Sequence, residues 1–85
     1  MENMIKEAVE SYMGVKVTKI EVVRDRQVEG TYAVHTRSKI KKGVKGVKDN
    51  YWLLVGLGSG TTVKDIEYNL EEVEFETWPP TSHGL

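Results

Sequence analysis

The sequence predicts an α+β domain in which an N-terminal helix packs on an antiparallel sheet of about four strands. Three observations predict this fold: a helical apolar period over residues 1–13, an alternation of apolar and polar side chains over residues 28–40, and glycine-rich breaks between the later elements. A chain of 85 residues fits one domain. We expect that domain to span residues 1–78 and a C-terminal tail to cover residues 79–85.

The first predicted element is a helix over residues 1–13. Its apolar side chains recur with helical spacing: Met1, Met4, Ile5, Ala8, Val9, Tyr12 and Met13. Gly14 follows at the position where a left-handed C-cap residue ends a helix. We expect the apolar stripe of this helix to pack on the sheet.

The next two elements are predicted strands joined by a polar turn at residues 24–27. In residues 15–23 the apolar positions change parity after Val17, which predicts either a β-bulge near Thr18 and Lys19 or partial cover of both faces of the strand. Residues 28–40 alternate with period two. The core face of this strand is expected to carry Val28, Tyr32, Val34 and Ile40, and the solvent face to carry Glu29, Thr31, Ala33, His35, Arg37 and Lys39.

The second half of the chain has a less regular pattern. A flexible loop is expected over residues 41–49, followed by a strand over residues 50–57. The apolar side chains of this strand have both parities, so it needs cover on both faces or a central place in the sheet. Residues 61–77 fit a strand as well as a helix, and a helix within residues 62–73 stays open because Thr62 and Asp65 resemble a capping box. We favour a strand, because the turn at residues 58–60 suits a hairpin.

This order of elements resembles the cystatin-like and PepSY-like architectures in general outline. The resemblance covers element order alone, because the chain contains neither the Gln-x-Val-x-Gly motif of cystatins nor another motif of either family. It implies a helix laid across an antiparallel sheet, and it carries over no functional residue.

The charges of the chain are segregated along the sequence, although the net charge is only −1. Between residues 37 and 48 there are six basic residues and no acid: Arg37, Lys39, Lys41, Lys42, Lys45 and Lys48. Between residues 65 and 76 there are six acids and no base: Asp65, Glu67, Glu71, Glu72, Glu74 and Glu76. Each segment is therefore either a binding surface or a partner that neutralises the other segment in the folded protein.

No residue pattern indicates catalysis, and we expect a protein that is not an enzyme and binds no cofactor. His35 and His83 stand beside no serine or carboxylate in a nucleophile motif. We interpret His35 as a solvent-facing histidine and His83 as part of the tail. The histidines and acids also lack the spacing of a metal site, and the chain has no cysteine.

The candidate ligand site combines the lysine loop with the glycine-rich turn, because ammonium and backbone N–H groups hold phosphate. The residues predicted to bind such a nucleotide-like or other anionic small ligand are Lys41, Lys42, Lys45, Lys48, Gly58, Ser59, Gly60 and Thr61. The turn has the spacing of neither a Gly-x-Gly-x-x-Gly motif nor a Walker loop. Nucleic-acid binding by the lysine loop is a further alternative, and the pI of about 6.1 argues against it.

The acidic segment is the candidate surface for a protein partner. It is expected to present Glu71, Glu72, Glu74, Glu76 and an exposed Trp78. The alternative is a solvated edge strand that its charges protect from aggregation. We expect a small interaction protein, of the kind that phages and mobile elements use as inhibitors or accessory proteins, and we favour a protein partner over a small anion or nucleic acid.

The sequence also bears on location and assembly. The N-terminus lacks the pattern of a signal peptide, and the longest apolar run, residues 51–57, is too short to cross a bilayer. We therefore expect a cytoplasmic protein that binds no membrane. A homodimer would supply cover for the second face of the strand at residues 50–57.

Overall fold

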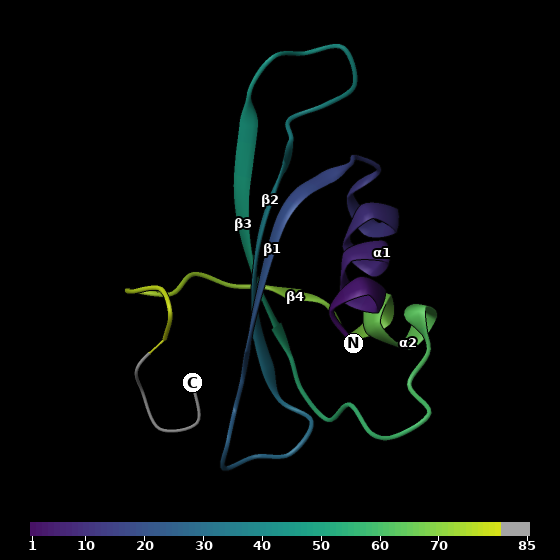
Figure 1. The fold of residues 1–85 in the computed structure, drawn as a ribbon, viewed down its shortest axis with the longest axis vertical. Helices are drawn as coiled ribbons and strands as arrows, with labels where there is room; N and C mark the ends of the chain where they lie inside the picture. The colour runs from purple at the N-terminus through teal and green to yellow at the C-terminus, as the bar shows by residue number, and fades with distance from the viewer. Residues whose placement is uncertain (81–85) are drawn as a thin grey trace.

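The structure, a computed structural model, describes residues 1–80; the rest of the predicted tail, with His83, lies outside this range. It has the predicted α+β fold, with helix α1 (Glu2–Met13) and a four-stranded antiparallel sheet in the order β1-β2-β3-β4. A second helix, α2 (Val63–Asn69), precedes β4 (Glu71–Glu72). Figure 1 shows α1 and α2 on one side of the sheet and the segment that follows β4 on the other side.

α1 forms as predicted, with a buried apolar stripe and a glycine at its C-terminus. Ile5, Ala8 and Val9 belong to the same buried cluster as residues of the sheet. The helix ends at Gly14, whose φ of 68° is left-handed and whose N–H donates to the Glu10 carbonyl at 2.9 Å. Glycine adopts this conformation at little cost because it has no Cβ.

β1 (Val17–Arg24) contains a bulge, which is one of the two alternatives that the sequence left open. Its pairing with β2 (Tyr32–Lys39) shifts register between Val17 and Lys19. The Thr18 hydroxyl donates to the Arg37 carbonyl at 3.0 Å, which ties the bulge to the neighbouring strand. Because the bulge adds one residue, Val17 and Ile20 both pack on the core although their parity differs.

The connection between β1 and β2 is longer than predicted, because a turn built on a side chain replaces a tight hairpin. The Asp25 carboxylate accepts hydrogen bonds from the N–H groups of Gln27 and Val28 at 2.8 and 3.1 Å. β2 consequently begins only at Tyr32. The prediction that Val28 lies on the core face is wrong, since its side chain is 51% exposed.

β2 and β3 (Val47–Leu54) form an uninterrupted ladder from the Tyr32–Leu54 pair to the Lys39–Val47 pair. On the side of the helices, Trp52 is buried opposite Val34, and its indole N–H donates to the Thr36 hydroxyl at 2.9 Å. β3 spans residues 47–54, so it starts and ends three residues earlier in the chain than the strand predicted over residues 50–57. Ile40 lies beyond the end of β2 and is exposed, so its predicted place in the core is wrong.

Residues 63–69 form α2, so the favoured prediction of a strand is wrong there. The Thr62 hydroxyl accepts from the Asp65 N–H at 3.2 Å, and the Asp65 carboxylate accepts from the Thr62 N–H at 2.9 Å. This reciprocal capping box satisfies two backbone donors, and Ile66 is buried in the core. The glycines at residues 58–60 thus lead into a helix instead of forming a hairpin turn.

Replacing Gly30 by alanine will destabilise the protein more than replacing Gly14. Both glycines have positive φ, 78° and 68°, so alanine is strained by about 1–2 kcal/mol at either position. A Cβ at Gly30 would also collide with the backbone of Leu57, whereas a Cβ at Gly14 would meet no atom within 4 Å. Urea denaturation will show the larger loss of unfolding free energy for Gly30→Ala. Equal losses in the two variants would contradict the close approach of Gly30 and Leu57.

Candidate functional site

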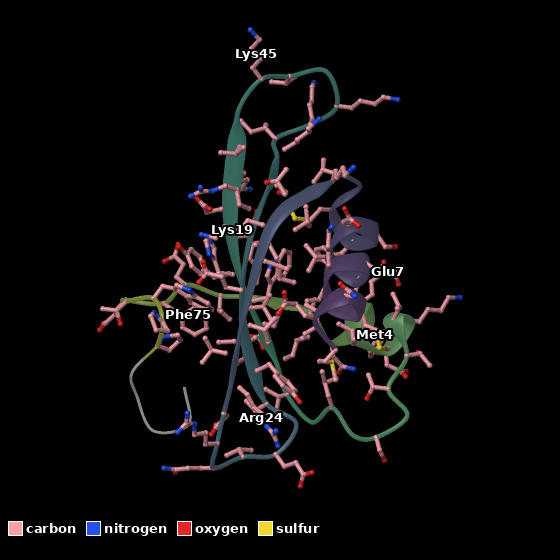
Figure 2. The ribbon with its side chains drawn as sticks, viewed as in Figure 1. Met4, Glu7, Lys19, Arg24, Lys45 and Phe75 are labelled. Atoms are coloured by element: carbon pink, nitrogen blue, oxygen red, sulfur yellow. The ribbon has the colours of Figure 1, made fainter. Side chains whose placement is uncertain are left out.

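The basic residues gather on a hairpin that projects beyond the rest of the domain. Residues 37–48, which we call the basic arm, comprise the end of β2, the connecting loop and the start of β3. Figure 2 shows Lys45 at the tip of the arm and Arg24, the last residue of β1, at the opposite end of the molecule. Gly43 and Gly46 have φ of 80° and 117°, which lets the loop turn. The β2–β3 ladder therefore holds the arm away from the core.

The lysines of the basic arm make no ion pair with any carboxylate that the structure describes. All of them are exposed: Lys39, Lys41, Lys42, Lys45 and Lys48. Arg37 differs, because its Nε donates to Asp49 Oδ1 at 3.1 Å. The positive charge of the arm is thus available to a partner.

Apolar side chains accompany these lysines on the arm. Ile40 is 50% exposed, Val44 is 42% exposed and Val47 is 54% exposed. Apolar side chains on the surface of a protein are common singly, but here three lie within one short hairpin. The arm consequently offers both charge and apolar area.

A pocket of about 380 Å³ lies at the base of the arm, where the arm meets the C-terminus of α1. Three lysines from separate segments line it: Lys16, Lys39 and Lys42. Glu10 lines it too, but its Oε2 already accepts the Val17 N–H at 3.0 Å. This arrangement suits a small anion. Of the predicted loop lysines, Lys42 lines the pocket and Lys41, Lys45 and Lys48 do not.

The predicted glycine-rich half of the ligand site lies elsewhere. Figure 1 shows the segment between β3 and α2 at the opposite end of the molecule from the arm. Within this turn the Thr61 hydroxyl donates to the Gly58 carbonyl, and the Asp65 carboxylate occupies the N-terminus of α2. The structure therefore does not bring Gly58, Ser59, Gly60 and Thr61 together with the lysines.

The predicted partner surface begins at the outer border of the sheet, where Glu71 and Glu72 form β4, and continues with Glu74 and Glu76 in the segment that follows β4. We call Glu71, Glu72, Glu74 and Glu76 the glutamate edge; all four are exposed. β4 pairs with β3 through Glu71 opposite Leu53 and Glu72 opposite Trp52. Glu72 Oε1 accepts from Asn50 Nδ2 at 2.8 Å. No ion pair joins this edge to the arm within residues 1–80, so neither surface neutralises the other.

Trp78 is not the exposed anchor that the sequence suggested. Residues 73–80, the C-terminal segment, fold back over the sheet face that the helices leave open. The Trp78 indole N–H donates to Glu21 Oε2 at 2.8 Å on β1, and its ring is half-buried. Trp78 thus fastens this segment to the sheet.

An aromatic cluster under the C-terminal segment buries His35. The imidazole stacks on Tyr51 with ring centroids 4.7 Å apart, and Trp78 lies 5.6 Å from both rings. Phe75 completes the cluster at 5.8 Å from Trp78. His35 is only 7% exposed and Ala33 on the same face is fully buried, so the prediction that these residues face solvent is wrong.

Carboxylates flank the buried imidazole on two sides. His35 Nε2 lies 2.9 Å from Asp49 Oδ1, and Nδ1 lies 3.9 Å from Glu21 Oε1 without a hydrogen-bond partner. Hydrogen bonds from Trp78 and Lys19 lower the pKa of Glu21. Hydrogen bonds from Arg37 and His35 lower the pKa of Asp49. Tyr51, Trp78 and these carboxylates enclose the imidazole, and the cluster packs the C-terminal segment against the sheet.

Sequence reasoning missed Lys16 and the aromatic cluster. Lys16 stands alone between two valines, and no pattern marks it. Period-two alternation does place His35 and Tyr51 in neighbouring strands, and an aromatic residue opposite a histidine could have indicated cover on that face.

The chain matches no protein-family model, no curated protein and no solved structure. Within residues 1–80, no group of three histidine or acidic side chains is placed to bind a metal ion. The helices described are all too short or too polar to cross a membrane.

Trp78→Ala will destabilise the protein by about 1–3 kcal/mol, because it removes a ring packed on His35 and Tyr51 together with a hydrogen bond to Glu21. The matched control is Tyr68→Ala, since the Tyr68 side chain is 90% exposed. That change should stay within about 0.5 kcal/mol of the wild type. Urea denaturation followed by circular dichroism measures both, and equal effects would refute the packing of the C-terminal segment.

Acid will destabilise the protein through Glu21 and Asp49. Their pKa values are lowered in the folded state, so their contribution is complete above the unfolded pKa of about 4 and is lost as the pH falls through the lower folded values. Denaturation midpoints measured between about pH 7 and pH 2 will fall below about pH 5. The variant Glu21→Gln with Asp49→Asn should lose less than the wild type over this range. If Glu7→Gln, at an exposed position of α1, reduced the loss as much, the assignment would be wrong.

Proposed function

We propose that this chain is a non-enzymatic interaction protein that binds an oppositely charged macromolecule through its basic arm and its glutamate edge. The observation that carries the proposal is the exposure of the arm lysines without any carboxylate partner in residues 1–80. A basic surface of this kind attracts an acidic partner and raises the rate of association. The glutamate edge does the same for a basic one.

A protein is the favoured partner. Ile40, Val44 and Val47 add exposed apolar area to the arm, and protein interfaces bury such area. Nucleic acid needs chiefly positive charge, and it would be repelled by the glutamate edge beside β3. The pI of about 6.1 is also below that of typical nucleic-acid-binding domains.

A small anionic ligand is a second candidate, favoured by the pocket at the base of the arm. Lys16, Lys39 and Lys42 would hold a phosphate or carboxylate there. This role does not need the glycine-rich turn. It is compatible with partner binding, because the tip of the arm lies outside the pocket.

The biological setting follows by elimination. A single small domain without a catalytic constellation and with segregated charges fits an inhibitor or accessory protein of a phage or mobile element. We place the protein in the cytoplasm, in keeping with a chain that contains no cysteine.

Affinity capture with charge-neutralised variants tests the proposal. The arm variant carries Lys41→Gln, Lys42→Gln, Lys45→Gln and Lys48→Gln, and the edge variant carries Glu71→Gln, Glu74→Gln and Glu76→Gln. From a nuclease-treated lysate, the wild type should retain a protein at about 50 mM salt and release it at about 1 M, where charges are screened within roughly 3 Å. One of the variants should retain at least about tenfold less of it, a loss of about 1.4 kcal/mol.

Three results would contradict this function. The first is that the wild type captures no protein, or captures only proteins that the arm variant and the edge variant retain equally well. The second is material that disappears on nuclease treatment, which would assign the arm to nucleic acid. The third is a thermal shift with phosphate compounds that Lys16→Gln abolishes, in the absence of any protein capture; this would assign the pocket to a small ligand instead.

A further inference from the structure

The outer edge of the sheet is only partly paired. β4 covers β3 at Trp52 and Leu53, and one further bond runs from the Val73 N–H to the Tyr51 carbonyl at 2.9 Å. Backbone groups of successive residues in a strand point to opposite sides, so the N–H and C=O of Asp49 and Val47 face the same way as those of Tyr51. No backbone partner for these groups exists among residues 1–80.

This free stretch begins inside the basic arm, at Val47, and reaches Asp49. Toward α2 it is followed by β4, whose residues Glu71 and Glu72 begin the glutamate edge. Along the outer side of β3, the positive charge of the basic arm therefore lies at one end of the free backbone groups, and the negative charge of the glutamate edge lies at the other end. The charges of this surface are therefore complementary to those of a second copy whose β3 strand runs in the opposite direction.

We propose that two copies of this chain form a two-fold dimer in which the free edges of the two β3 strands pair antiparallel, so that each basic arm lies along the glutamate edge of the other copy. A two-fold axis makes both contacts at once, because an isologous interface requires a self-complementary patch. The inference rests on the proposed function, since it assigns a partner to the same charged surfaces.

The exposed apolar side chain of Val47 supports pairing at this place. Val47 lies in the free stretch with its side chain 54% exposed, and pairing of two β3 strands would cover it in both copies. Addition of a strand to a sheet edge also satisfies the outward N–H and C=O groups. The lysines and glutamates would then find the ion-pair partners that they lack within one chain.

The other sheet edge is protected against such pairing. β1 carries the bulge between Val17 and Lys19, and Lys19 pairs with Glu21 at 2.9 Å on this strand. A bulge blocks edge-to-edge association, because it twists the edge of the strand away from a neighbouring chain. The free part of β3 has no bulge and no proline.

Charge-reversed variants test the dimer by sedimentation velocity and light scattering. The wild type at about 100 µM should be a dimer at low salt and dissociate at about 1 M salt. The acidic-arm variant, Lys42→Glu with Lys45→Glu and Lys48→Glu, brings acid against acid in both contacts. The basic-edge variant, Glu71→Lys with Glu74→Lys and Glu76→Lys, brings base against base. Each alone should be monomeric. Their equimolar mixture should form a heterodimer, because both contacts then join opposite charges.

Two further variants distinguish the contribution of backbone pairing to the dimer from that of charge. Val47→Pro removes one outward N–H without changing charge and should weaken the dimer at least about tenfold. Glu2→Lys with Glu7→Lys reverses two acids on α1, away from the edge, and should leave the dimer unchanged. Because Glu72 keeps its bond to Asn50, the basic-edge variant is designed to remain folded, which circular dichroism checks. If it did not fold, the Val47→Pro and acidic-arm variants would decide.

A wild type that stays monomeric would overturn the inference, as would a mixture of folded variants that fails to associate. Assemblies larger than a dimer would refute the two-fold arrangement. The proposed function fails separately: a monomeric chain that still captures a different protein through its arm loses only the dimer, whereas a charge-dependent dimer that captures nothing else loses only the external partner.

Discussion

The register of the β2–β3 ladder is the constraint on which the rest of this structure depends. It sets Val34 against Trp52 on the side of the helices, and that pair forms the centre of the core. On the opposite side the same register sets His35 against Tyr51, the platform on which the C-terminal segment packs. A slip of one residue would exchange the two faces and expose the tryptophan. The ladder also continues past the helices, and that continuation is the basic arm.

The ladder explains why the opposite charges of this chain do not cancel. The lysines follow the end of β2 and are carried outward with the hairpin, whereas β4 joins β3 at Trp52 and Leu53, nearer the core. The basic and acidic residues that are separated along the sequence therefore also stay apart in the folded protein. Arg37 is the exception, because Asp49 lies directly opposite it in the ladder. Charges held apart in this way form no stabilising ion pairs with each other within residues 1–80, and this is the observation behind the proposed binding function.

The sequence allowed the fold class and α1 to be predicted, because the apolar side chains of residues 1–13 have a helical period. The change of parity in β1 left a bulge as one of two alternatives. The sequence did not give α2, although the Thr62–Asp65 capping box was visible, since Ile66 and Leu70 also alternate as in a strand. The burial of His35 could not be predicted from β2 alone. It depends on Phe75 and Trp78, some forty residues later in the chain, folding across that face.

Amide hydrogen exchange along β3 tests the central claim most directly, since it reports the register and the free edge together. In dilute protein the account predicts slow exchange at Lys48 and Asn50, which bond to β2, and fast exchange at Val47 and Asp49, which face outward. At high concentration Val47 and Asp49 should become protected while Lys48 and Asn50 change little. Slow exchange at all four amides in dilute protein, or unchanged exchange at Val47 and Asp49 on concentration, would contradict it.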